Sequence, residues 1–177
     1  MTTGANVLRR GRVSGLLLTL LGAWGALIPF VGPYFGYAYT PDKAWAYNSG
    51  RLWLSVAPGA AVFLGGLLAT VSARAAQVGA FLAALGGAWF VLGQPVTAVA
   101  VSNGSITAGT PVVGAGAAFS AATMRLLEGL GFFYGLGVVI VFLAALVFGE
   151  VLVSRLANRE YQTAAPMGPE DQYDPAY

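Results

Sequence analysis

The chain has 177 residues, of which 57% are hydrophobic and 9% are charged, and its formal net charge is +2 at pH 7. A soluble globular domain usually carries about 25% charged residues, so this chain has too little polar surface to coat a water-facing domain. It contains no Cys and no His, which excludes disulfides, thiolate nucleophiles, Cys zinc sites, Ser–His triads and His-bound haem. The composition predicts an integral membrane protein.

Four apolar stretches follow one another along the chain, at residues 13–31, 52–71, 75–96 and 129–148. Each is close to the roughly 20 residues that a helix needs to cross the hydrocarbon core of a bilayer. We therefore predict an all-α membrane protein built as a four-helix transmembrane bundle. The first stretch also has the basic start and small residues of a signal peptide, an alternative that its length and the repeat described below argue against.

The basic residues are distributed unevenly between the two ends of the predicted spans. Because cytoplasmic loops carry the excess of Lys and Arg, we expect residues 1–12 and 150–177 to be cytoplasmic and the loops 32–51 and 97–128 to face outward. The C-terminal segment is rich in Pro and acidic residues, so we expect most of it to be disordered. Six basic residues lie at the inner end and three at the outer end: Arg9, Arg10, Arg12, Arg74, Arg155 and Arg159 against Lys43, Arg51 and Arg125.

A weak internal repeat relates the two halves of the chain. The sequence Gly-Ala-Trp at residues 22–24 recurs at 87–89, and a proline follows each copy, at Pro29 and Pro95. This recurrence predicts two helix–loop–helix repeats, 13–71 and 75–149. They are parallel repeats, related by a rotation axis along the membrane normal. The alternative is chance recurrence in a chain rich in Gly and Ala.

Both outer loops contain signals for β-hairpins. Aromatic residues alternate on either side of Pro-Asp at 41–42, and β-favouring residues flank Asn-Gly at 103–104, the strongest short hairpin signal. Two such hairpins would form a small β cap on the outer side of the bundle. The alternative is that the third helix extends to Val101 and the rest of the loop is coil.

Ionisable residues mark the outer ends of spans two and four. Arg125 and Glu128 lie three residues apart, so on a helix they share a face and can pair. Arg51 has the matching position before span two, and an Arg51–Glu128 contact would join the repeats. Nearby, Pro58 should kink the second helix and free a backbone carbonyl. Ionisable groups in a membrane are costly unless paired or hydrated, so the cluster is either a ligand site or, as we favour, an interfacial ion pair.

Aromatic residues gather at the same outer boundary. Tyr and Trp favour this zone because one part of the side chain is apolar and the other is polar. An outer aromatic belt accounts for them, and a site for a lipid or glycolipid headgroup is the alternative. The residues are Tyr37, Tyr39, Trp45, Tyr47 and Trp53.

Small residues at four-residue intervals are candidates for helix packing, because they let helix backbones approach closely. We expect them to pack helices within the chain rather than to form a dimer face. They are Gly131 and Gly135 in the fourth span and Ala80, Ala84 and Ala88 in the third.

A family resemblance rests on Gly-Ala-Trp at 22–24, Ile-Pro-Phe-Val at 28–31, Gly-Tyr at 36–37, Trp45, Trp53 and Pro-Gly at 58–59. In these features the first repeat resembles the SPW-repeat membrane proteins, small bacterial proteins with two spans per repeat. The Ser-Pro-Trp motif of that family reads Ile-Pro-Phe here and Gln-Pro-Val at 94–96. With its preference for Arg over Lys, the chain also resembles small four-span membrane proteins of actinobacteria. The resemblance implies an architecture and no activity.

These features favour a non-enzymatic structural or accessory component of a bacterial plasma membrane that acts through protein–protein contacts. The middle of each span lacks Asp, Glu, Lys and Arg, which argues against a proton relay or ion pump, and Glu150 is expected to be a solvated boundary charge. The alternative is binding or passage of a small lipid or apolar molecule between spans two and four. We expect contact with the lipid bilayer and a membrane-protein partner or a homo-oligomer, and no catalytic residue, cofactor, metal or nucleic acid.

Overall fold

The computed structural model describes residues 3–35, 44–47, 49–102, 123, 127, 129–131 and 133–163. Four long helices dominate this part of the chain: α1 (Thr3–Val31), α3 (Ala57–Val71), α4 (Ala73–Ser102) and α6 (Tyr134–Thr163). Short elements adjoin two of them: the 3-10 helix η1 (Gly32–Phe35), α2 (Ser49–Arg51) and the π-helical turn η2 (Leu52–Val56).

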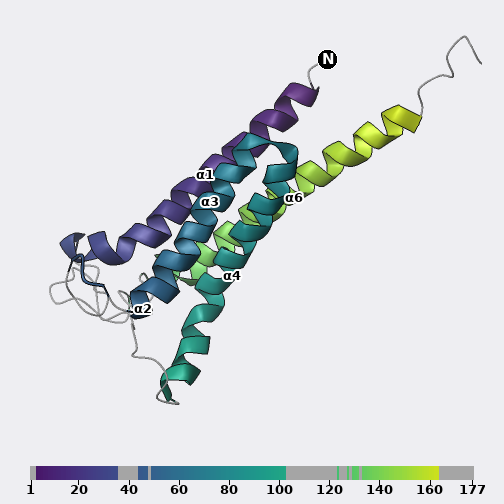
Figure 1. Ribbon diagram of the computed structural model, residues 1–177. Helices are drawn as coiled ribbons and strands as arrows, with labels where there is room; N and C mark the ends of the chain where they lie inside the picture. The colour runs from purple at the N-terminus through teal and green to yellow at the C-terminus, as the bar shows by residue number, and fades with distance from the viewer. Residues whose placement is uncertain are drawn as a thin grey trace, which may run out of the picture.

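The long helices form a bundle in which neighbours along the chain are neighbours in space (Figure 1). α1 packs on α3, α3 on α4 and α4 on α6, and α6 returns to α1, which closes the ring. The start of α1, the turn between α3 and α4, and the end of α6 share one end of the bundle, whereas α2 lies at the other. We call these the turn end and the α2 end.

Each long helix contributes to a segment that is long and apolar enough to cross a membrane. The prediction of an all-helical chain with four such segments is therefore confirmed for the described residues. The segments are Arg12–Tyr34, Ser49–Val71, Ala73–Gly93 and Gly129–Ala157.

Glycines let α1 and α3 touch backbone to backbone. A Cβ atom added to Gly22 would collide with the backbone of Phe63, and one added to Gly59 would lie 2.5 Å from the backbone nitrogen of Ala26. Gly66 meets α1 in the same way two turns further along α3. Because no side chain fits at these positions, any substitution must push the helices apart.

The other helix pairs repeat this arrangement. Between α3 and α4, a Cβ atom on Gly65 would collide with the carbonyl oxygen of Gly79, and the reverse is also true. Between α4 and α6, a Cβ atom on Gly137 would lie 2.6 Å from the carbonyl oxygen of Gly87. Three of the four contacts in the ring are therefore set by glycine.

A π-helical turn accommodates the proline in the second span. The Ala57 N–H bonds to the carbonyl of Leu52, five residues earlier, and Pro58 lies in the first turn of α3, where a missing N–H is tolerated. With the same five-residue spacing, an N–H at position 58 would donate a hydrogen bond to the carbonyl of Trp53, but proline has no N–H. The Nε1–H of Trp89 donates to that carbonyl oxygen instead, at 2.8 Å. The carbonyl that the proline frees is thus satisfied from α4, as an apolar medium requires.

The structure corrects the expectation of a β cap in one respect. α4 continues to Ser102, so the β-strand predicted at residues 97–101 is wrong and the alternative, a third helix that reaches Val101, is correct. A helix satisfies its backbone groups within itself, whereas a strand needs a partner. In the first predicted hairpin, residues 34–35 belong to η1 and residues 44–47 form no strand. Residues 36–43 and 103–122 lie outside the described residues.

We predict that Trp89→Phe lowers the free energy of unfolding by about 0.6–2 kcal/mol, the range found for hydrogen bonds between membrane helices. Phenylalanine keeps most of the apolar surface but cannot donate to the Trp53 carbonyl. Unfolding in mixed micelles, followed by circular dichroism, measures the loss.

Two further variants separate this hydrogen bond from general packing. Trp24 is the counterpart of Trp89 in the first Gly-Ala-Trp sequence and is 49% exposed, so Trp24→Phe should change stability by less than about 0.5 kcal/mol. Pro58→Ala restores an N–H near the Trp53 carbonyl, so Trp89→Phe should cost less in that background. Equal losses in both backgrounds would contradict the assignment.

Candidate functional site

Arg51 ends α2 and is completely buried. Among the described residues, it is the only charged side chain that is buried in this way. Its Nη1 donates to the carbonyl oxygen of Ala46 at 2.7 Å, and its guanidinium carbon lies 5.8 Å from the ring centroid of Phe30, within the range of a cation–π contact. Arg51 therefore ties the segment 44–47 to the end of α1.

Two aromatic side chains from this segment pack on Phe30. The Trp45 ring stacks on it with centroids 5.8 Å apart, and the Tyr47 ring lies 5.0 Å away. Trp45 has a φ of 59°, a left-handed conformation that is uncommon outside glycine and costs about 1–3 kcal/mol. The ring stacking and the hydrogen bond to Ala46 hold the backbone there. We call Phe30, Trp45, Tyr47 and Arg51 the aromatic platform.

The predicted cluster at spans two and four is seen only in part. Arg51 and Pro58 are both buried, whereas Arg125 and Glu128 lie outside the described residues. An Arg51–Glu128 contact therefore remains a prediction. The contacts of Arg51 with Phe30 and Ala46 were missed in the sequence analysis, because neither of these residues carries a charge.

The aromatic residues at the outer boundary divide in the same way. Trp45, Tyr47 and Trp53 are 56%, 77% and 60% exposed at the α2 end, whereas Tyr37 and Tyr39 lie outside the described residues. Trp53 meets the rest of the bundle through its backbone carbonyl, so its side chain is free to face the surroundings.

The predicted packing residues differ in their surroundings. Ala80 is 1% exposed in the core, and Ala84 and Ala88 are half-buried beside it. Gly131 is exposed, with no described atom within 4 Å of an added Cβ, and such a Cβ on Gly135 would first meet Leu130 of its own segment. The backbone contacts between helices lie at other glycines.

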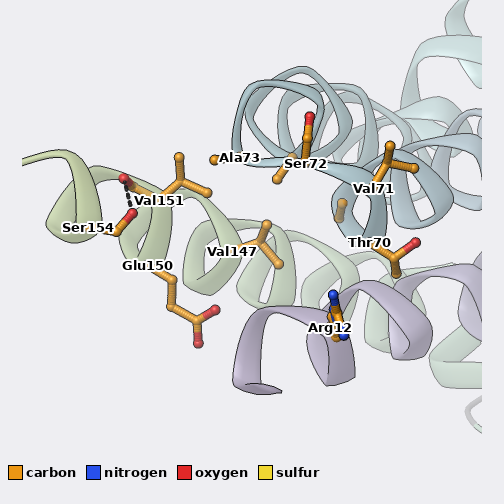
Figure 2. Close-up of a pocket in the computed structure, with 11 residues that line it drawn as sticks. Arg12, Thr70, Val71, Ser72, Ala73, Val147, Glu150, Val151 and Ser154 are labelled. Carbon is orange, nitrogen blue, oxygen red and sulfur yellow. Dashed lines mark hydrogen bonds between the residues drawn. The ribbon is translucent and has the colours of Figure 1, made fainter. Parts of the chain in front are cut away.

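A second site lies at the turn end, where a cavity of about 140 Å³ separates the ends of the helices. All four long helices contribute to its lining: Arg12 from α1, Ala69–Val71 from α3, Ala73 and Ala76 from α4, and Val147, Glu150, Val151 and Ser154 from α6, with Ser72 in the turn. In Figure 2 the side chains of Arg12 and Glu150 lie below Val147, and Val71, Ser72 and Ala73 lie above it. The two charged side chains thus lie on one side of Val147, and the start of α4 lies on the other.

Glu150 corrects a further expectation. The sequence suggested a solvated charge at the boundary, but the residue is only half exposed and its Oε2 atom is buried. The cause is that the fourth apolar segment extends to Ala157, so Glu150 faces the bundle one turn before Ser154. Ser154 directs its hydroxyl to the carbonyl of Val151 at 2.8 Å.

Comparisons with family models, with curated proteins and with solved structures give no match to this chain. The resemblance to SPW-repeat proteins therefore rests on the residues of the first repeat alone.

We predict that Arg51→Leu releases the segment 44–47. The substitution leaves the Ala46 carbonyl without the Arg51 donor and removes a charge-assisted hydrogen bond of about 1.5–3 kcal/mol. Chymotrypsin cleavage after Trp45 or Tyr47, measured on the purified protein in detergent, should accelerate by about tenfold or more, since cleavage follows local opening.

The matched control is Arg74→Leu, which removes an exposed arginine at the turn end. Its cleavage rate should equal that of the wild type. Equal acceleration in both variants would point to general destabilisation and would contradict a local role for Arg51.

Proposed function

We propose that the protein is a non-enzymatic structural or accessory component of a bacterial plasma membrane and that it acts through contacts with another membrane protein. The observation that carries this proposal is the aromatic platform. A buried arginine at the membrane boundary is costly unless it is well paired, and here its hydrogen bond serves to fix two exposed aromatic residues. Tyr and Trp are the residues most enriched at the energetic centres of interfaces.

The rigidity of the support agrees with a docking role. Phe30 is 5% exposed and belongs to α1, which glycine contacts lock against α3. An aromatic side chain that is already ordered loses little conformational entropy when a partner binds. The platform therefore offers a preformed surface at the α2 end.

We also infer that both termini face the cytoplasm and that the two halves are parallel repeats. The six-to-three distribution of basic residues supports the orientation. The repeat is supported by equivalent contacts, because Gly22 of the first copy packs α1 on α3 and Gly87 of the second packs α4 on α6.

Site-specific photocrosslinking tests the docking role. A benzoylphenylalanine at position 47 should give a discrete protein adduct in native membranes. The same group at Leu20, which is 59% exposed on α1 at mid-span, should give none, because that position faces lipid. Arg51→Leu should lower the yield at position 47, since the platform is released. Recovery of only the uncrosslinked chain from position 47 would overturn the proposal.

Single-cysteine labelling tests the orientation. The chain has no Cys, so Tyr47→Cys and Ser72→Cys each carry one reactive thiol. In intact bacterial cells, a membrane-impermeant maleimide should label Tyr47→Cys and should label Ser72→Cys only after the membrane is opened. The reverse pattern would place both termini outside.

A second candidate function is binding of a small lipid between spans two and four. The cavity at the turn end favours it, because its lining includes the end of α3 and two turns of α6. This position lies at the opposite end of the bundle from Arg51 and Pro58, where the sequence had suggested such a site.

A further inference from the structure

The cavity at the turn end lies at the level where the hydrocarbon core of a bilayer ends. Arg12 is the first residue of the first candidate span, Val71 is the last of the second, and Ala73 is the first of the third. All three line the cavity. The lining from α6 lies within the fourth span, which ends at Ala157. A group bound there would therefore lie at the boundary between the headgroups of one leaflet and its hydrocarbon.

One part of the lining suits an anion. Arg12 contributes a guanidinium, which binds phosphate oxygens with two parallel hydrogen bonds. α4 begins on the other side of the cavity, above Val147 in Figure 2: the Ser72 hydroxyl accepts from the Ala75 N–H at 3.2 Å, and Ala73 lines the cavity among the first N–H groups of a long helix. The positive end of the helix dipole adds to the attraction of the arginine.

Another part of the lining suits a cation. Glu150 places a carboxylate in the same cavity, and its Oε2 is shielded from the surroundings. A carboxylate has about four acceptor positions, so it can receive an ammonium group in addition to its contacts within the protein. Shielding from water strengthens such an interaction.

The size and the apolar lining indicate which molecule carries both charges. The volume of about 140 Å³ is below the roughly 300–1,000 Å³ of pockets that enclose a whole drug-sized ligand, so it suits a headgroup with its tails outside. Val71, Val147 and Val151 supply the apolar part of the lining. A headgroup that carries both a phosphate and a primary ammonium matches the charges of Arg12 and Glu150.

We propose that the cavity binds the headgroup of phosphatidylethanolamine, with the phosphate at Arg12 and the ammonium at Glu150. This inference rests on the second candidate function and is independent of the aromatic platform. Phosphatidylcholine has no N–H to donate to the carboxylate, and phosphatidylglycerol has no positive charge. Both should therefore bind more weakly.

Native mass spectrometry of the full chain in detergent tests the proposal. The protein is mixed with equal amounts of phosphatidylethanolamine, phosphatidylcholine and phosphatidylglycerol that carry the same acyl chains. The wild type should retain phosphatidylethanolamine about tenfold over the other two, as one charge-assisted hydrogen bond allows. Glu150→Gln should abolish this preference, and Arg12→Gln should reduce retention of all three lipids.

Arg155→Gln is the matched control, because Arg155 is exposed on α6 near the cavity but does not line it. It should leave the retention pattern unchanged, and circular dichroism melting should show that all variants are folded.

Equal retention of the three lipids in every variant would mean annular lipid only and would overturn both the site and the second candidate function. Retention that depends on Arg12 without a preference for phosphatidylethanolamine would overturn the headgroup assignment alone. Displacement of the lipid by excess inorganic phosphate would also overturn it, in favour of a free-phosphate site.

Discussion

Contact between helix backbones at glycine determines how the other parts of this molecule can be arranged. Water does not drive helices together inside a bilayer, so association depends on close packing and on hydrogen bonds between helices. Gly22 and Gly59 bring α1 and α3 into contact, and Gly65 and Gly79 do the same for α3 and α4. α3 is therefore held on two sides, and its N-terminal neighbours have a fixed position against both α1 and α4.

That fixed position makes two costly local features tolerable. Near α4, the π-helical turn ahead of Pro58 leaves a carbonyl that the indole of Trp89 can reach at 2.8 Å. Near α1, Arg51 is placed under Phe30 and within 2.7 Å of the Ala46 carbonyl. Both hydrogen bonds form only when the neighbouring helices have one particular distance and relative rotation, because a hydrogen bond weakens steeply with distance and angle. A side chain at Gly22 or Gly79 would disturb them although it touches neither.

Composition and hydropathy were sufficient to predict four apolar helices, because length and polarity alone decide whether a helix can span a bilayer. The contacts between them were harder to predict. Small residues at a four-residue interval pointed to Gly131 and Gly135, whereas the glycines that contact other helices, Gly15 and Gly22 and also Gly59 and Gly66, recur at an interval of seven, which also places them on one helix face. The Trp89–Trp53 bond and the burial of Arg51 depend on helix register, which hydropathy does not contain. The strand at 97–101 failed because β-favouring residues do not override a helix that continues from a membrane span.

The two ends of the bundle use their few charges in opposite ways. At the α2 end, Arg51 is enclosed and its hydrogen bond goes to the protein's own backbone, so the charge stabilises a surface and is not itself exposed to a ligand. At the turn end, Arg12 is exposed and shares a cavity with Glu150, so an external group can compete for both. The difference follows from packing: Arg51 is fully buried beside Phe30, whereas near Glu150 no glycine of α6 touches another helix, since Gly149 has nothing within 4 Å. The surface proposed for a protein partner and the cavity proposed for a lipid headgroup share no residue, so occupation of one would not block the other.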